Sequence, residues 1–581
     1  MLNGKKVVAL VQARCTSTRL PLKHFRYIGD KMLIDWVVDR LESINEIDEI
    51  IISTTNDVTD KPLKEYADRK GIGFYGFDGD INDVVGRHYN ALKDVSADYV
   101  IIISGDCPLV DKEVINSQLQ LLHKGYSYCR PTKPCIHEGI DSYSSKCIEF
   151  INENSKTSYE RENFGIIIRE NLELVEIGYF SLEDKYLENN FRISVDNMAD
   201  LRFMNKCFKA IKDKNKSFDL DNVIDLVKED KELLNENSHV EQKKKGERTY
   251  KFLIKTEASQ DKGLGHIKRM MALGQFLNEN KNNGVHYAIN NNEIAKKLLE
   301  EKGCGFDYNY AESEEELIKL TKEYKPDVII IDVQKLDGNT NYNFENMKKQ
   351  TGVRKIILID KYVEDDFIDL MIIQGIQSDE FEEKVKGNNK VIYGLDCVFI
   401  GEEFIKLKKE RENIKKNIST EEKEIVISFG GSDAKNLTVQ TIKKLKNISI
   451  DFKVKFKIIL GPYYDNMSEL KKELINFNCK YEIVKNPDNY AQQLVNADYG
   501  IIAYGVSFYE FLYMGIPTIN FTVQDNDINI IRKLKQMHLD FSIMEIIKNL
   551  NISYGFKNID ICNKERIYGY IIRENEENAK V

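Results

Sequence analysis

Residues 11–23 read VQARCTSTRLPLK and decide how the first part of this chain folds. They follow the apolar run Val7–Leu10, which is expected to form a buried strand, and they contain two arginines, one lysine and several small hydroxyl residues. A strand that ends in a basic turn with free backbone N–H groups is suited to binding phosphate. The crowded basic side chains favour a nucleoside triphosphate over a single anion, while an ordinary polar turn after a first strand is the alternative interpretation.

Beyond this turn, short β-branched strands alternate with longer amphipathic helices. Strands are expected at 6–11, 49–54 and 99–104, and helices at 31–44 and 61–70. This alternation is typical of βαβ units with a mostly parallel sheet. Ligands of such sheets bind at the carboxyl ends of the strands.

Two aspartates that follow apolar runs form a candidate metal site. Asp106 comes directly after the strand at 99–104, and Phe191–Val195 is interpreted as a further short strand that ends on Asp196. Carboxylates together with phosphate oxygens hold Mg²⁺ in proteins, so a magnesium site is expected at these two residues. Helix capping is the alternative for Asp106, and Asp200 is expected at a helix start.

The ordered motif Ala-Arg-x-x-Ser-Thr-Arg-Leu-Pro-x-Lys, with Arg14, Ser17, Arg19 and Lys23, resembles the signature of sugar-acid cytidylyltransferases. This group contains the CMP-Kdo, CMP-sialate and spore-coat polysaccharide synthetases. Leu22 stands where the Kdo enzymes usually have glycine. The resemblance implies that the four matching residues bind CTP.

The resemblance also implies a metal-assisted cytidylyl transfer, in which a sugar-acid hydroxyl attacks the α-phosphorus of CTP and pyrophosphate leaves. The segment DVVGRHY at 83–89 resembles an element of the spore-coat branch, and Arg87 then contacts the nucleotide or the substrate. A solvated helix start is the alternative. Arg161 is left open between a sugar carboxylate and a surface ion pair. The expected catalytic residues of this part are Arg14, Lys23, Asp106 and Asp196.

Residues 228–249 are dominated by charged side chains and are predicted to be a linker. They separate a first domain at 1–227 from a later part that begins near residue 250. A solvated helix end is the competing interpretation of the charged stretch. A second charged segment near 406–416 divides the later part into lobes at 250–415 and 416–581.

A new strand at 251–255 is followed by Gly263, Gly265 and His266, which open an amphipathic helix. A Gly-x-Gly turn is weak evidence alone, and a histidine at a helix start is often structural. With Glu257-Ala258-Ser259 in front, this segment resembles the UDP-sugar hydrolase of pseudaminic acid synthesis. The resemblance implies that His266 is the base that activates water.

Two later turns extend the resemblance to enzymes of the GT-B type. Gly430-Gly431-Ser432 follows a strand and is expected to bind a diphosphate through main-chain N–H groups. Gly505, Ser507 and Glu510 repeat this arrangement, and the resemblance places Glu510 on the ribose hydroxyls. The spacing of Ser507 and Glu510 also fits a structural capping box.

Asp332 and Asp360 end two further strands, at 327–332 and 355–360. The hydrolase-like family has acidic residues at comparable places, but aspartates at strand ends commonly cap helices. Helix capping is therefore the preferred interpretation of both. The segments Gly515-Ile516-Pro517-Thr518 and Asp525-Asn526-Asp527 continue the resemblance, with Asp527 where glutamine is usual.

Composition sets outer bounds on the function. A length of 581 residues suggests three or four domains, and 42% hydrophobic with 31% charged residues is typical of a globular protein. The net charge of -10 argues against broad nucleic-acid binding, and ten scattered cysteines favour reduced thiols. No apolar run approaches the roughly 20 residues of a membrane span, so a cytoplasmic protein is expected.

We therefore predict an α/β fold, with an N-terminal Rossmann-like nucleotidyltransferase domain of GT-A type followed by a two-lobed GT-B domain. The resemblances together imply a bifunctional enzyme of nonulosonic acid biosynthesis, of the pseudaminic or legionaminic type. It would use CTP, Mg²⁺, a sugar acid and a UDP-linked diacetamido trideoxy sugar, which it hydrolyses. A true glycosyltransferase or a non-catalytic nucleotide-sugar-binding module are alternatives for the later part, and a homodimer through the N-terminal domain is left open.

Overall fold

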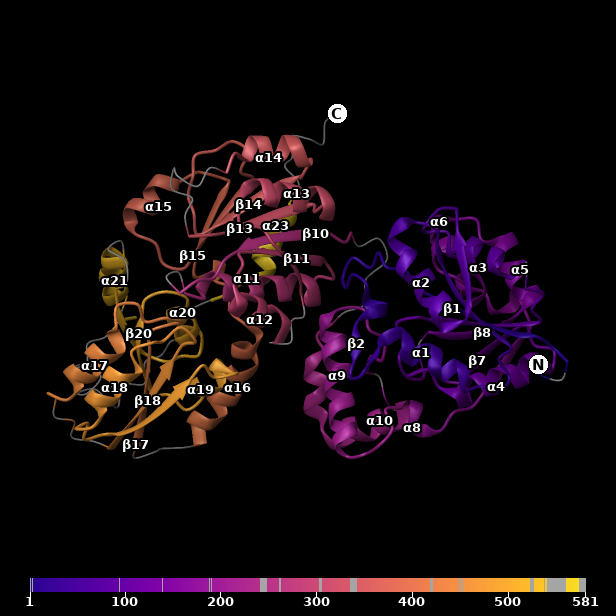
Figure 1. The fold of residues 1–581 in the computed structure, drawn as a ribbon, viewed down its shortest axis with the longest axis horizontal. Helices are drawn as coiled ribbons and strands as arrows, with labels where there is room; N and C mark the ends of the chain where they lie inside the picture. Colours follow the sequence, from indigo (N-terminus) through magenta and orange to yellow (C-terminus); the bar gives the residue numbers. More distant parts are fainter. Residues whose placement is uncertain are drawn as a thin grey trace. The chain divides into compact units, whose positions relative to one another are not determined.

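The computed structural model describes residues 2–573 apart from 3, 94, 138, 188, 190, 241–247, 261–262, 302–305, 335–341, 418–421, 449, 451–452, 523–526, 538 and 541–560. The chain divides into two compact units, Met1–Glu247 (unit 1) and Arg248–Val581 (unit 2). Each unit has its own hydrophobic core. Figure 1 shows the helices and strands of both units.

Unit 1 is built on one mixed sheet with the strand order β5-β4-β1-β6-β8-β7-β9. The first four of these strands run parallel, as the βαβ alternation predicts, while β8 runs antiparallel to β6. The strands of unit 1 are β1 (Val7–Gln12), β2 (Tyr27–Ile28), β3 (Lys31–Met32), β4 (Glu49–Thr55), β5 (Gly73–Phe77), β6 (Tyr99–Ser104), β7 (Tyr128–Pro131), β8 (Ile140–Ser144) and β9 (Ile177–Phe180).

The longer helices of unit 1 each bury an apolar face, and several of them contact strands of this sheet. α3 and α5 lie side by side over one face, where Val8, Leu10 and Val100 of the sheet join the core (Figure 1). The helices are α1 (Leu33–Glu42), α2 (Lys61–Lys70), α3 (Val84–Leu92), α4 (Lys112–His123), α5 (Ser145–Asn154), α6 (Ser158–Glu162), α7 (Ile166–Glu170), α8 (Asp184–Leu187), α9 (Met198–Asp213) and α10 (Leu220–Glu229), with short 3₁₀ turns η1 (Lys23–Phe25), η2 (Val58–Asp60), η3 (Leu172–Leu174) and η4 (Lys231–Glu236).

The strand expected at Phe191–Val195 is absent from the described residues, so that prediction is wrong. Ile193 and Val195 are both buried, so buried apolar residues alternate with others as they do in a strand. The segment nevertheless joins no sheet. Its Val195 N–H instead donates to the carbonyl of Asp106 at 2.9 Å. The segment therefore lies beside the end of β6 without being a strand. Asp200 does stand in the first turn of α9, as expected.

Unit 2 contains two sheets in which every paired strand is parallel. This confirms the α/β class and the prediction that the later part has two lobes. The first sheet has the order β12-β11-β10-β13-β14-β15-β16 and the second β19-β18-β17-β20-β21. Their strands are β10 (Lys251–Thr256), β11 (Gly284–Ile289), β12 (Asp307–Tyr310), β13 (Val328–Asp332), β14 (Lys355–Ile359), β15 (Leu370–Gln374), β16 (Val391–Gly394), β17 (Glu422–Ser428), β18 (Lys453–Leu460), β19 (Lys480–Lys485), β20 (Tyr499–Ala503) and β21 (Thr518–Phe521).

Helices follow most strands of unit 2, as a parallel sheet requires. They are α11 (Gly265–Gln275), which continues into the π-helical turn η5 (Phe276–Asn280), α12 (Glu293–Glu301), α13 (Glu314–Tyr324), α14 (Phe344–Thr351), α15 (Asp379–Val385), η6 (Leu395–Cys397), α16 (Glu402–Asn417), α17 (Leu437–Leu445), α18 (Met467–Leu474), α19 (Tyr490–Leu494), α20 (Val506–Tyr513), α21 (Asp527–Gln536) and α23 (Lys564–Ile572).

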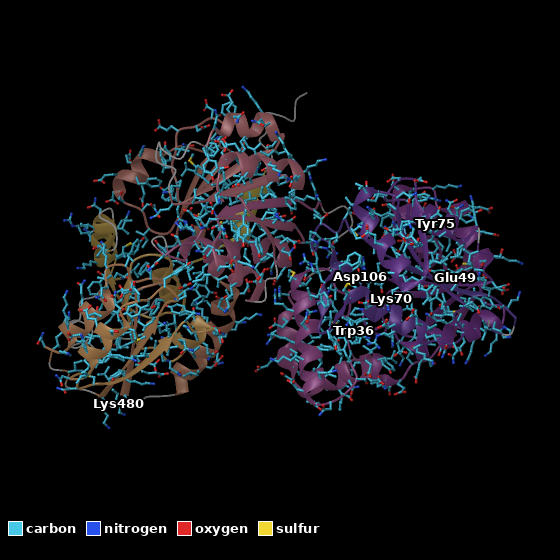
Figure 2. The ribbon with its side chains drawn as sticks, in the orientation of Figure 1. Trp36, Glu49, Lys70, Tyr75, Asp106 and Lys480 are labelled. Carbon is cyan, nitrogen blue, oxygen red and sulfur yellow. The ribbon has the colours of Figure 1, made fainter. Side chains whose placement is uncertain are left out.

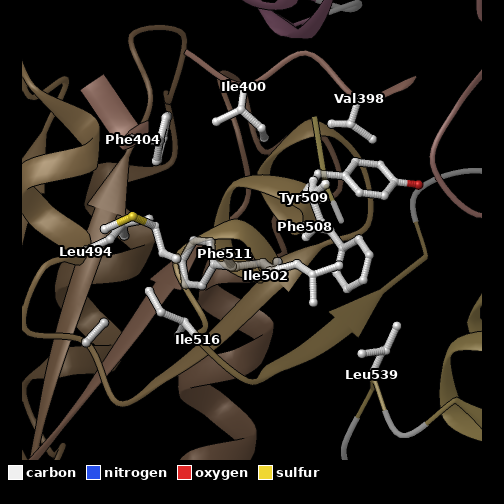
Figure 3. Packing of buried hydrophobic residues seen from close by; sticks show 14 of the residues in the cluster. Val398, Ile400, Phe404, Leu494, Ile502, Phe508, Tyr509, Phe511, Ile516 and Leu539 are labelled. Atoms are coloured by element: carbon white, nitrogen blue, oxygen red, sulfur yellow. The ribbon is translucent and has the colours of Figure 1, made fainter. Parts of the chain in front are cut away.

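The two lobes of unit 2 are joined by packing as well as by the chain. Val398, Ile400 and Phe404, which follow the first sheet, enter the core of the second lobe together with Phe508 and Phe511 (Figure 3). In the other direction, α23 returns to the first lobe, where the hydroxyl of Tyr568 accepts a hydrogen bond from Asn283 at 3.1 Å.

The charged segment near 406–416 is part of α16 and is ordered against the second lobe. Arg411 is buried there and donates to three main-chain carbonyls, those of Leu494, Val495 and Met514. Among the described residues no helix is long and apolar enough to cross a membrane, and nine cysteines are free thiols.

Arg411→Ala should destabilise unit 2, because three buried carbonyls lose their donor. Buried acceptors left unpaired cost about 1–3 kcal/mol each before relaxation, so we expect the free energy of unfolding to fall by about 3 kcal/mol. Urea denaturation followed by fluorescence measures this. Lys409→Ala, on an exposed position of the same helix, is the matched control and should change stability by less than about 0.5 kcal/mol. Equal stability of the two variants would contradict the assignment.

Candidate active sites

The turn after β1 is held by a buried carboxylate that sequence reasoning missed. Asp60, only 1% exposed, accepts from the backbone N–H of Cys15 at 2.6 Å. Its other oxygen accepts from the hydroxyls of Thr54 and Thr55, at 2.7 and 2.6 Å. The end of β4 therefore fixes the position of the basic turn. Only the run of two threonines before a turn hinted at this in the sequence.

His24 ties the same turn to the loop that carries Asp106. Its Nε2 lies 3.3 Å from the backbone N–H of Arg14, and its Nδ1 lies 3.0 Å from the carbonyl of Gly105. Burial first, and the Lys23 charge second, lowers the pKa of His24 to about 4. The ring is therefore neutral near pH 7, with Nδ1–H donating to Gly105 and Nε2 accepting from Arg14.

Four of the predicted residues of unit 1 meet at one point, the end of β6, where Figure 2 labels Asp106. The Lys23 ammonium contacts the carboxylate of Asp106 and lies 3.0 Å from that of Asp196. Arg19 is 2.9 Å from Asp196. Burial raises the pKa of Asp196, but the charges of Lys23, Arg19 and Arg192 outweigh this and hold the pKa well below its ordinary value.

The donor set at this point suits Mg²⁺. Within the described residues no group of three or more His, Cys, Asp or Glu side chains could hold a metal by itself. Magnesium usually takes only one or two protein carboxylates and completes its shell with phosphate oxygens and water, so Asp106 and Asp196 fit it when a triphosphate is present. The Lys23 ammonium lies between the two carboxylates.

Arg87 is a buried guanidinium that Asp60 and Asp83 influence through their charge without contacting it. It is 2% exposed, and its side chain makes no hydrogen bond or ion pair with any described residue. Burial, and after it the neighbouring charge of Arg14, lowers the pKa of Arg87 to about 10. A buried charge without a partner is costly. The pair Arg14 and Arg87 is therefore arranged to receive an anionic ligand.

The remaining residues of the first motif have local roles. Ser17 accepts weakly from the backbone N–H of Leu20, at 3.4 Å. Leu22 adopts φ 53° and ψ 30°, in the left-handed region that favours glycine, at a cost of about 1–2 kcal/mol.

Arg161 forms a bidentate ion pair with Asp83 at 2.7 and 2.8 Å. Of its two interpretations, the ion pair is therefore the one that the structure contains.

In unit 2, His266 stands at the start of α11 and contacts a buried carboxylate at the end of β13. Its Nδ1 lies 2.7 Å from Asp332, which also receives Arg269 at 2.6 Å. Arg269 contacts Asp360 as well. The interpretation of Asp332 and Asp360 as helix caps is wrong, because both face the first turns of α11 across the ends of β13 and β14.

The glycine turns of the two lobes face each other within unit 2. A Cβ atom on Gly431 would meet the Leu264 side chain at 3.3 Å, and one on Gly265 would meet Val506 at 3.4 Å. Gly263, Gly265, Gly430, Gly431 and Gly505 are thereby gathered around one region. The backbone N–H groups of Gly431 and Ser432 have no acceptor among the described residues.

Glu510 lies in the same region. Burial first, partly offset by the charge of Lys268, raises the pKa of Glu510 to about 7, and Ser507 hydrogen-bonds its carboxyl group. The capping-box interpretation is wrong, because the residue that precedes α20 is Gly505 and no side chain caps it. Tyr490 donates to Ser428 at 3.0 Å and lies under the Lys268 ammonium. Asp525 and Asn526 lie outside the described residues.

Comparison with known proteins gives the following similarities. Residues 8–272 match the profile of the cytidylyltransferase family. An uncharacterized protein of Methanocaldococcus jannaschii is 30% identical over 244 residues, which are 41% of this chain and 97% of that protein. A second uncharacterized protein of that organism is 28% identical over 310 residues, 50% of this chain and 60% of that protein, so less than two thirds of its length is covered.

Two named proteins are also similar. The spore coat polysaccharide biosynthesis protein SpsF of Bacillus subtilis is 25% identical over 208 residues, 33% of this chain and 82% of that protein. Among solved structures, the UDP-GlcNAc 2-epimerase of Neisseria meningitidis bound to UDP-GlcNAc is 12% identical with a TM-score of 0.36, covering 56% of this chain and 100% of that one.

The buried neutral His24 predicts that unit 1 loses stability in acid. The pKa of a histidine in the unfolded chain is near 6.5 and that of His24 is about 4, so between these values the unfolded state binds more protons and stability falls as pH falls. The loss from this group is about 3 kcal/mol. His24→Phe should be less stable at pH 7.5 and lose less on acidification, as urea denaturation at several pH values would measure.

The exposed histidine His123→Phe is the matched control and should keep the wild-type pH dependence. His88, whose pKa is also held well below its usual value by burial and by Arg87, keeps part of the acid sensitivity in the His24 variant. A His24→Phe curve parallel to that of the wild type would contradict the assignment.

Proposed function

Because the chain belongs to the cytidylyltransferase family through residues 8–272, we propose that unit 1 transfers the cytidylyl group of CTP to a sugar acid. The observation that carries this proposal is the buried, unpaired Arg87 beside Arg14. Two guanidinium groups that no described carboxylate contacts match a triphosphate, which offers several oxygens to each of them. Lys23 and Arg19 lie on the same turn and add two further positive charges.

The reaction needs no covalent intermediate with the protein. The sugar-acid hydroxyl gives its proton to solvent and its oxygen bonds to the α-phosphorus of CTP. The bond from that phosphorus to the bridging oxygen breaks, and its electron pair leaves with pyrophosphate. Arg14, Arg19, Lys23 and Arg87 bind the phosphate charge that shifts toward the leaving group. Mg²⁺, when bound at Asp106 and Asp196, would supply further charge neutralisation.

For unit 2 we propose binding of a UDP-sugar between its two lobes, followed by hydrolysis of the bond to UDP. The facing glycine turns support diphosphate binding, since unpaired main-chain N–H groups such as those of Gly431 and Ser432 attract anions. His266 is the proposed base, and its contact with Asp332 supports this role. A UDP-linked diacetamido trideoxy sugar is the proposed substrate, which would make the sugar acid of unit 1 a nonulosonic acid.

Purified protein with CTP, Mg²⁺ and a panel of sialic-acid-like sugar acids should release pyrophosphate. Arg87→Leu should weaken CTP binding by about 10- to 100-fold, since a charge-assisted hydrogen bond contributes roughly 1.5–3 kcal/mol. Thermal stability should not fall, because the substitution removes an unpaired buried charge. Arg69→Leu, on the exposed face of α2, is the control. No pyrophosphate with any acid, or unchanged CTP affinity in Arg87→Leu, would overturn the proposal for unit 1.

His266→Ala should abolish most UDP release from UDP-linked diacetamido sugars while calorimetry still detects UDP binding. We expect the rate to fall by about 10²- to 10⁴-fold, the usual contribution of a general base. Mass spectrometry of the freed sugar distinguishes hydrolysis from transfer to another acceptor. His286→Ala, a histidine on β11 of the same lobe, should keep the wild-type rate. UDP-sugar binding without turnover in the wild type would instead support a non-catalytic module.

A further inference from the structure

Behind His266 lies a buried network of one arginine and two aspartates from three different elements. Asp332, at the end of β13, has no exposed side-chain surface, and Arg269 is 10% exposed. The Arg269 guanidinium donates through Nε and Nη2 to both oxygens of Asp332, at 2.6 and 2.5 Å, and contacts Asp360 through Nη1. All three nitrogens of the guanidinium therefore contact carboxylates.

The network determines where the proton of His266 lies. Burial raises the pKa of Asp332, but Arg269 first and His266 second outweigh it, so the pKa is below its usual value and the carboxylate is ionised. An ionised oxygen 2.7 Å from Nδ1 requires a proton on that nitrogen. Nη2 of Arg269 also lies 3.0 Å from Nδ1, but it already donates to the charged Asp332 carboxylate, which is a stronger acceptor than an imidazole nitrogen.

The second ring nitrogen is left without a protein partner. No described residue hydrogen-bonds to Nε2 of His266, and the side chain is 17% exposed. With the proton on Nδ1, Nε2 carries the lone pair and is able to accept a proton. The glycine turns of the second lobe lie close to the start of the same helix, as the approach of Gly431 to Leu264 shows.

The position of Asp360 is also fixed by its own backbone conformation and by hydrogen bonds with β15. It adopts φ 52°, in the left-handed region that is strained for a residue with a side chain. Its Oδ1 accepts from the backbone N–H of Gln374 at 2.7 Å, and its own N–H donates to the carbonyl of Ile372. A strained backbone that aims a carboxylate at Arg269 is typical of a functional site.

We propose that Asp332 is a positioning residue that fixes His266 in the tautomer with the proton on Nδ1, while Arg269 and Asp360 hold the Asp332 carboxylate in place. This inference rests on the proposed hydrolysis of a UDP-sugar by unit 2. In the step, a water O–H bond breaks and its proton passes to Nε2, the water oxygen bonds to the anomeric carbon, and the carbon–oxygen bond to UDP breaks with its electron pair. The imidazolium that forms is stabilised by the adjacent Asp332 charge.

The direct test is the protonation of His266 in the full-length chain labelled with ¹⁵N-histidine. The sequence has eight histidines, and His266→Gln assigns the signal. At a pH where the ring is neutral, the wild type should show a protonated Nδ1 and an unprotonated Nε2. A wild-type His266 with its proton on Nε2 would overturn the proposal, and this measurement requires neither a variant of Asp332 nor an active enzyme.

The kinetic test uses Asp332→Asn, which keeps the shape of the side chain and removes its charge. UDP release should fall by about 10³- to 10⁴-fold, as expected when a base loses its tautomer and the charge that stabilises its protonated form. UDP affinity should change by less than about threefold, because the nucleotide lies on other residues. Asp327→Asn, at the opposite end of β13, is the matched control and should keep the wild-type rate.

The outcomes separate the two proposals. If the wild type releases no UDP from any UDP-sugar, the proposed hydrolysis fails while the ¹⁵N spectrum still tests the placement of the proton. If the wild type is active and Asp332→Asn folds, as circular dichroism would show, but retains full activity and the wild-type tautomer, the role of Asp332 is refuted.

Discussion

The ion pairs of Lys23 with Asp106 and Asp196 are the constraint on which unit 1 depends. The three side chains come from the turn after β1, the end of β6 and the segment before α9, far apart in the sequence. Charged side chains that gather at one buried point are stable only when each is paired with an opposite charge. His24 and Asp60 then hold the two loops that carry them. The charges therefore fix the loops, and the loops form the nucleotide site.

Unit 2 also pairs charged side chains at a buried point, but with a different set of residues. Arg269 compensates Asp332 and Asp360 at the ends of neighbouring parallel strands, and His266 completes the cluster from the following helix. In both units, carboxylates at or near the carboxyl ends of strands are paired with positively charged side chains. These come from a turn in unit 1 and from the first turns of a helix in unit 2. Parallel sheets bring such residues together because all their strands end at the same edge.

Local patterns in the sequence predicted much of the fold. The strand at 99–104 and the helix at 61–70 have the expected bounds, because apolar periodicity and turn residues act over short distances. The segment at 191–195 shows the limit: alternating burial looks like a strand, but only pairing with a neighbour makes one.

Long-range partners were harder to predict. Asp60, His24 and the contact of Asp332 with His266 connect residues 10 to 81 positions apart, and nothing in the local sequence specifies such pairs.

The most direct test of cytidylyl transfer by unit 1 is the fate of label from α-³²P CTP incubated with the chain, Mg²⁺ and a nonulosonic acid. We expect the label to move into a CMP-linked sugar acid. Label that stays in CTP, or appears only in free CMP, would contradict it.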